Sequence, residues 1–256
     1  MDLGIASRVA LVAGASQGIG RAVAIGLAKE GADVILLARS ADKLEDAAKE
    51  IRALGRRAEP VAVAAEDRAA LRSAVERATK ALGEPTILVL AIAAMWAPQK
   101  LQFTSDEEID RLLDTDVVSA IDLCRLVLPG MMQQRFGRIV TIGSVAARSG
   151  VSGGTLYATS KAALEGLMRG IALDDSRRGI TANTVAVSFA DTERLASRTA
   201  GDQEARDRLV RATATRKIPL PEDIADVVTF LCSPRASAIT GAVVDATAGA
   251  HLNNLW

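Results

Sequence analysis

The sequence contains few of the residues that build the commonest metal and nucleophile sites. Its 256 residues include one histidine, one tyrosine and two cysteines. With His251 alone near the C-terminus, we expect neither a multi-histidine metal site nor a histidine-based catalytic triad. Cys124 and Cys232 lie in apolar surroundings without metal-ligand spacing, so we expect buried thiols in a reducing compartment.

An excess of charge and a long apolar run are both missing. The chain has 31 basic and 31 acidic residues, so its formal net charge gives no reason to expect nucleic acid or an anionic membrane as a partner. No apolar run reaches the length that spans a bilayer. The first such run, Val9–Ala13, breaks at once into glycines, unlike a signal peptide. We therefore expect a cytoplasmic protein.

Short apolar runs alternate with longer segments of helical periodicity along the whole chain, as in α/β proteins. We predict strands at 8–13, 33–38, 58–64, 86–93, 138–143, 181–187 and 242–245, and helices at 21–30, 41–54, 67–82, 105–134, 155–178 and 221–232. We expect the long helix 105–134 to kink near Pro129–Gly130. The pattern predicts one domain over residues 1–256, with a nucleotide-binding half at about 1–145. Its fold class is α/β: a Rossmann-like, doubly wound parallel sheet of about seven strands with helices on both faces.

A glycine-rich loop, G-A-S-Q-G-I-G at Gly14–Gly20, separates the first strand from the first helix. Glycines allow a tight turn and a close approach to a pyrophosphate, and the helix that follows presents free N–H groups. The strand, loop and helix together favour dinucleotide binding over a simple tight turn. The residues we expect to contact the dinucleotide are Gly14, Ser16, Gln17, Gly18, Ile19 and Gly20.

Tyr157, the only tyrosine, is followed four residues later by Lys161. At this spacing a helix places the phenol and the ammonium on one face. A nearby cation favours the ionised phenol, which can then donate and accept a proton. Ser144, thirteen residues before the tyrosine, adds a second hydroxyl at the end of a strand. The alternative, a packed aromatic beside a solvated lysine, is common for such a pair and is less favoured here only because of the glycine loop.

One connection is too long for an ordinary turn of such a sheet. The polar, arginine-rich segment 188–217 follows a strand at the edge where ligands bind. We expect it to form a lid over the binding crevice, and the alternative is a solvated helical insertion without contact to substrate.

Taken together, these motifs resemble those of the short-chain dehydrogenases/reductases over essentially the whole length. The resemblance rests on A-G-A-S-Q-G-I-G at 13–20, Ser144, Y-A-T-S-K at 157–161, I-T-A-N-T-V at 180–185 and P-E-D-I-A at 221–225. It implies an oxidoreductase that moves hydride between a nicotinamide dinucleotide and a carbonyl/alcohol pair. It also implies a small-molecule substrate and a homo-oligomer, either a tetramer or a dimer.

The resemblance also implies roles for single residues. Tyr157 becomes the general acid in reduction and the base in oxidation, Lys161 holds the nicotinamide ribose, and Ser144 orients the carbonyl oxygen. Thr192 matches a position that contacts the nicotinamide carboxamide. Asp116 stands where the family has an asparagine that serves a proton-relay water.

Cofactor preference depends on the end of the second strand, where NAD-dependent proteins of this fold commonly carry an acid. Here the residue is Arg39, which offers a fork of donors to a 2′-phosphate. We therefore predict NADP(H) rather than NAD(H), the alternative being that Arg39 only faces solvent.

The chain also departs from the family at several secondary motifs. The departures are Leu90–Ala93 in place of N-N-A-G, Ala64 in place of an adenine-contacting aspartate, Asp116, Val187-Ser188 in place of P-G, and Asp245-Ala246-Thr247 in place of D-G-G. Ala93 still takes a cofactor-facing position. The departures predict an adenosine pocket less polar than usual and weaker binding there. They leave two alternatives to carbonyl reduction: non-redox chemistry with the same Ser/Tyr/Lys set, or a non-catalytic dinucleotide sensor or scaffold.

Overall fold

The computed structural model describes residues 2–252 and contains one parallel sheet. Its strands are β1 (Val9–Ala13), β2 (Asp33–Ala38), β3 (Ala58–Ala62), β4 (Ile87–Leu90), β5 (Gly137–Ser144), β6 (Ile180–Val187) and β7 (Val243–Asp245). They lie in the order β3-β2-β1-β4-β5-β6-β7, and every neighbouring pair is parallel. The predicted fold class and number of strands are therefore confirmed. The order of the strands reverses between β1 and β4, which is where such sheets open a crevice at their carboxyl edge.

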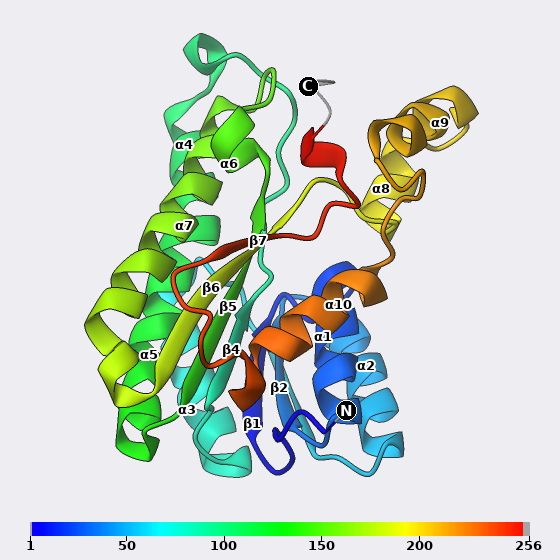
Figure 1. Ribbon diagram of the computed structural model, residues 1–256. Helices are drawn as coiled ribbons and strands as arrows, with labels where there is room; N and C mark the ends of the chain where they lie inside the picture. Colours follow the sequence, from blue (N-terminus) through cyan, green and yellow to red (C-terminus); the bar gives the residue numbers. More distant parts are fainter. Residues whose placement is uncertain (1, 253–256) are drawn as a thin grey trace.

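Helices cover both faces of the sheet (Figure 1). The main ones are α1 (Gly18–Lys29), α2 (Ala41–Ala53), α3 (Arg68–Leu82), α5 (Ser119–Gln134), α7 (Thr155–Asp175) and α10 (Pro221–Leu231). Side chains of α1, α2 and α10 form one core cluster with the sheet, and those of α3, α5 and α7 form the other. Both faces of the central strands are thereby removed from water, which explains their unbroken apolar runs.

Helix starts follow the local sequence. Asp67 is the N-cap of α3 and accepts a hydrogen bond from the Ala70 amide. Pro221 occupies the first turn of α10, where its missing N–H costs nothing, and Asp223 accepts from the amide of Leu220.

The long helix predicted over 105–134 is interrupted, but not at Pro129–Gly130. Helix α4 (Asp106–Leu113) runs into a π-helical turn, η2 (Asp114–Val118), and α5 then continues without a break through Pro129. Pro129 is exposed, while Gly130 is buried where a Cβ would come within 2.8 Å of the Glu84 carboxylate. The helix is therefore not interrupted at Pro129–Gly130, and its irregular turn lies at Asp114–Val118 instead.

The remaining elements lie mostly toward the carboxyl edge of the sheet. They are α6 (Ala146–Ser149), α8 (Glu193–Arg198), α9 (Gln203–Ala212) and the 3₁₀ turns η1 (Leu101–Phe103), η3 (Ser176–Arg178), η4 (Pro234–Ala236) and η5 (Ala250–Leu252). In Figure 1, α8 and α9 project at the upper right, beyond the end of β6. Among the described residues, no helix has both the length and the apolarity needed to cross a membrane.

Candidate functional site

Two glycines of the loop between β1 and α1 leave no room for a side chain. Gly14 has φ +90°, and a Cβ there would lie 2.6 Å from the carbonyl oxygen of Ala91. A Cβ on Gly20 would collide with the carbonyl oxygen of Gly14. No acidic residue lies in the first turn of α1, and the side chain of its N-cap residue, Gln17, does not bond the free amides. These amides and the positive end of the helix dipole form a site for an anion.

A cleft of about 640 Å³ opens at the carboxyl edge of the sheet beside this loop. All eleven residues predicted to contact the cofactor line it: Gly14, Ser16, Gln17, Gly18, Ile19, Gly20, Arg39, Ala93, Tyr157, Lys161 and Thr192. Thr192 caps α8 and lies over the glycine loop, since a Cβ on Gly18 would be 3.3 Å from its methyl group. The cleft has the volume and the polar groups to accommodate a dinucleotide.

Basic side chains line the cleft where β2 ends. Arg39 is exposed, and Lys43, in the first turn of α2, donates a hydrogen bond to the Gln17 side chain at 2.5 Å. The sequence analysis missed Lys43, which lies in α2 four residues after Arg39. Two cations and the Ser40 hydroxyl fit a phosphate group at this end of the cleft.

The wall beyond β3 is formed by Val63, Ala65 and Glu66. Val63 and Ala65 make this wall apolar, as we expected from Ala64 standing in place of an aspartate. Glu66, however, places a carboxylate on the same wall, a feature that the sequence analysis missed.

Tyr157 and Lys161 lie one turn apart on α7, as predicted. The Lys161 Nζ is 5.7 Å from the centroid of the Tyr157 ring. The ring of Trp96 stacks on the same tyrosine, with centroids 5.0 Å apart and planes inclined by 20°. Gly154 provides the space for the indole, because a Cβ there would lie 3.0 Å from Trp96. The phenol is thus set between a fixed ring and an ammonium.

Ser144 lies at the end of β5 and is buried. Its Oγ accepts a hydrogen bond from the Ala146 amide at 3.2 Å. Its neighbours in the strand, Ile142 and Gly143, line the cleft, whereas the serine itself lies just outside that lining.

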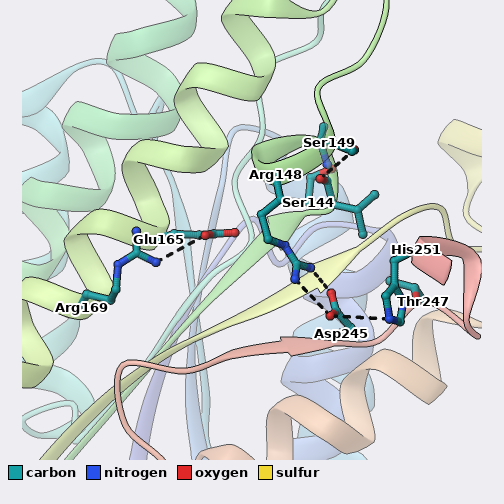
Figure 2. Close-up of polar contacts among 10 residues, drawn as sticks. Ser144, Arg148, Ser149, Glu165, Arg169, Asp245, Thr247 and His251 are labelled. Carbon is teal, nitrogen blue, oxygen red and sulfur yellow. Dashed lines mark hydrogen bonds and ion pairs between the residues drawn. The ribbon is translucent and has the colours of Figure 1, made fainter. Parts of the chain in front are cut away.

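A polar cluster holds the segment that follows Ser144 (Figure 2). Arg148 of α6 donates hydrogen bonds to both carboxylate oxygens of Asp245 on β7. The His251 ring shares a hydrogen bond of 2.7 Å with Thr247, and its Nε2 lies 3.9 Å from the same aspartate. Asp245, the residue of the D-G-G motif that this chain keeps, therefore ties α6 to the last strand.

Asp116 lies on the π-helical turn η2 and is buried. It forms an ion pair with Lys161, with 3.3 Å between Oδ2 and Nζ. Its other oxygen accepts from the Ala94 amide at 2.6 Å. The resemblance placed Asp116 at the site, but its direct ion pair with Lys161 was not predicted.

The lid expected at 188–217 contains α8 and α9, and its first half lines the cleft. Arg194 reaches across to donate to the Ala94 carbonyl at 3.1 Å and to the Met95 sulfur at 2.9 Å. On the opposite wall, Arg111 of α4 donates to the Met95 carbonyl at 2.9 Å. The ion pair between Asp191 and Arg206 connects the start of this segment to α9. These cross-cleft contacts had no signal in the sequence.

Comparison with known proteins places the chain among reductases. Residues 14–251 match the family model described as enoyl-(acyl carrier protein) reductase. The chain is 34% identical to the 3-oxoacyl-[acyl-carrier-protein] reductase FabG of Pseudomonas aeruginosa over 251 residues, which cover 98% of this chain and 100% of the relative.

Two solved structures extend the comparison to the fold. A 3-oxoacyl (acyl-carrier-protein) reductase from Agrobacterium tumefaciens, with NADP bound, superposes with a TM-score of 0.91 at 32% identity, covering 97% of this chain and 96% of that one. The L-sorbose reductase of Gluconobacter frateurii, complexed with NADPH and L-sorbose, has a TM-score of 0.91 at 28% identity and covers 99% and 100%.

Proposed function

The chain belongs to the short-chain dehydrogenase/reductase family, and from this premise we propose how its residues interconvert a carbonyl and an alcohol with NADP(H). The observation that carries the proposal is that one cleft is lined by the glycine loop, by Arg39 and Lys43, and by Tyr157 with Lys161. Dinucleotide binding, selection of the 2′-phosphate and proton transfer can therefore take place in one cavity.

The dinucleotide is held by groups of three kinds. The amides of the glycine loop bind the pyrophosphate, because its glycines allow close approach to the backbone and the start of α1 is positive. Arg39 and Lys43 bind the 2′-phosphate. Lys161 binds the nicotinamide ribose, and Thr192 lies where it can contact the carboxamide. Ala93 provides a small side chain on the facing wall.

Tyr157 moves the proton. In reduction, its hydroxyl protonates the carbonyl oxygen, and Ser144 donates a hydrogen bond to the same oxygen. When bound, NADPH supplies the hydride that the carbonyl carbon accepts. The phenolate left on Tyr157 is stabilised by the Lys161 ammonium and regains its proton from solvent, and oxidation follows the same steps in reverse.

The substrate class is a ketone, with 3-oxoacyl thioesters the first choice. This choice follows the name of the Pseudomonas relative, while the sorbose reductase shows that the same fold accepts a sugar. Exposed apolar side chains, Met95, Leu101 and Phe103, lie on the loop after β4 and can contact an acyl chain.

The test is to follow loss of NADPH with a panel of carbonyl compounds that includes acetoacetyl thioesters, simple ketones and ketoses. Turnover with NADPH, faster than with NADH, supports the proposal. Tight NADPH binding without turnover of any compound favours a sensor. Product formation without loss of NADPH favours non-redox chemistry.

Three further features belong to the same proposal. Residues 188–217 form the lid, and residues 1–145 form the nucleotide-binding half. The chain assembles into a homotetramer or dimer, as the family resemblance suggests, which light scattering tests. It resides in the cytoplasm, in keeping with two free, buried thiols.

A further inference from the structure

The side chain that faces the Lys161 ammonium is a carboxylate. The Asp116 Oδ2 lies 3.3 Å from Nζ, with 3% of the lysine side chain and none of the aspartate side chain exposed. Solvent screens such a pair little, so each charge strongly affects the other.

Asp116 also accepts on both carboxylate oxygens, from the Ala94 amide on one and from the Lys161 ammonium on the other, and an amide side chain could not satisfy both donors. The Ala94 amide donates to Oδ1 at 2.6 Å, and the Ser160 hydroxyl lies 3.1 Å from Oδ2. An asparagine that accepted from the Ala94 amide would turn its NH₂ group toward Lys161 and Ser160. The donors around this position therefore select an ionised carboxylate.

We infer that Asp116 is a positioning residue that anchors Lys161 and offsets its charge, so that the Tyr157 phenol responds to an ion pair rather than to a bare ammonium. The inference rests on the proposed role of Tyr157 as acid and base. Its consequence is that the phenol ionises, and the enzyme works as a base, at higher pH than it would with a neutral residue at position 116.

The other charged groups near this pair do not replace it. On α7, Tyr157 and Glu165 lie one turn to either side of Lys161. Arg111 of α4 and Arg194 of α8 direct their guanidinium groups to the carbonyls of the β4 loop. Asp114, on the same π-helical turn, is exposed.

The experiment uses the fact that Tyr157 is the only tyrosine. The near-ultraviolet absorbance of phenolate therefore titrates this one group in the protein without cofactor, and Tyr157→Phe must abolish the signal. We expect Asp116→Asn to move the titration midpoint down by about one pH unit, the effect of removing one negative charge at close range. The matched control, Asp114→Asn, removes an exposed charge from the same turn and leaves the midpoint nearly unchanged.

A second variant guards against loss of folding in Asp116→Asn. Asp116→Ala removes the same charge without leaving an amide in the buried site, so the midpoint should again move to lower pH. A midpoint in Asp116→Asn equal to or above that of the wild type overturns the inference. If only Asp116→Ala folds, an unchanged or higher midpoint overturns it.

The pH dependence of kcat/KM gives a second readout. In Asp116→Asn the basic limb of the kcat/KM profile should move to lower pH by the same interval as the midpoint of the phenol titration. If the wild type reduces no carbonyl compound, the proposed function fails, while the titration still decides the role of Asp116. If the wild type turns over and its phenol midpoint is the same as that of Asp116→Asn, the inference about Asp116 fails while the proposed function stands.

Discussion

The indole ring of Trp96 is stacked on the phenol ring of Tyr157, with 5.0 Å between centroids and 20° between planes. Aromatic pairs of this geometry contribute about 0.5–1.5 kcal/mol beyond the area that they bury. Trp96 comes from the loop after β4 and Tyr157 from α7, so a second element of the fold contacts the ring that we propose as the acid and base.

Removal of this contact should slow the reaction without affecting the cofactor. For Trp96→Ala we expect kcat to fall by about two- to tenfold, the loss that corresponds to the stacking energy. NADPH affinity, measured by calorimetry, should stay the same. Trp96→Phe keeps a ring in place and should retain most of the activity, and equal kcat values for all three proteins would show that the stack does not position the phenol.

The phenol itself can be tested more directly. Tyr157→Phe keeps the ring and its stack but removes the proton donor, so kcat should fall by at least about a hundredfold. The dissociation constant for NADPH should change little. Ordinary turnover in this variant would transfer the acid/base role to another group, and the Ser144 hydroxyl would be the first to examine.

Selection of the cofactor depends on Arg39 and Lys43. Arg39→Asp replaces a phosphate donor with a repelling charge, so NADPH should bind about 10–100 times more weakly, while NADH binding is retained or improved. Lys43→Ala should also weaken NADPH binding, but by a smaller factor. The control is Arg21→Ala on α1, whose guanidinium pairs with Glu50 outside the cleft. Loss of NADPH and NADH affinity in equal measure would contradict a role for Arg39 in reading the 2′-phosphate.

Local rules of sequence predicted the sheet and most of the cleft. All seven strands were found because parallel strands buried on both faces carry short apolar runs. The cleft-lining residues of the glycine loop were predicted because glycines between a strand and a helix allow a tight turn and a close approach to a ligand. The α7 pair was found because residues four apart share a helix face.

Features that depend on contacts between distant segments were not predicted. The π-helical turn at Asp114–Val118 adds one residue to a helical turn, and neither proline nor glycine marks it. The pairing of Asp116 with Lys161 joins residues 45 positions apart, and Arg194 reaches Ala94 across the cleft. Such contacts follow from the packed fold and have no periodic signal in the chain.

The contact between Arg194 and the β4 loop predicts how the lid holds the cofactor. Arg194→Ala removes a hydrogen bond to the Ala94 carbonyl, a loss of about 1 kcal/mol, so NADPH should dissociate about five times faster. Stopped-flow displacement with excess NADP⁺ measures this rate. Arg198→Ala, on the same helix but exposed, is the matched control. If both variants release NADPH at the wild-type rate, the lid does not retain the cofactor through this contact.

Stability at acid pH should depend on a cluster at the opposite edge of the sheet. Asp33, at the start of β2, is buried and accepts hydrogen bonds from the Arg57 amide at 2.9 Å, the Arg57 guanidinium at 2.8 Å and the Arg56 guanidinium at 2.7 Å. Burial alone would raise the pKa of the Asp33 carboxyl, but the hydrogen bonds from Arg57 and the charges of Arg56 and Arg57 outweigh it and lower the pKa below its ordinary value of 3.8.

A lowered pKa in the folded state means that ionised Asp33 stabilises the fold above its unfolded pKa, and that this contribution is lost as the pH falls below about 4. Asp33→Asn should therefore reduce the free energy of unfolding by about 1–3 kcal/mol at neutral pH, and the difference from the wild type should shrink below about pH 4. Urea denaturation at a series of pH values measures this. Asp46→Asn is the control, because its pair with Lys49 is exposed and contributes little. If the difference in free energy of unfolding between the wild type and Asp33→Asn stayed constant down to about pH 3, the charge of Asp33 would not be the source of its contribution.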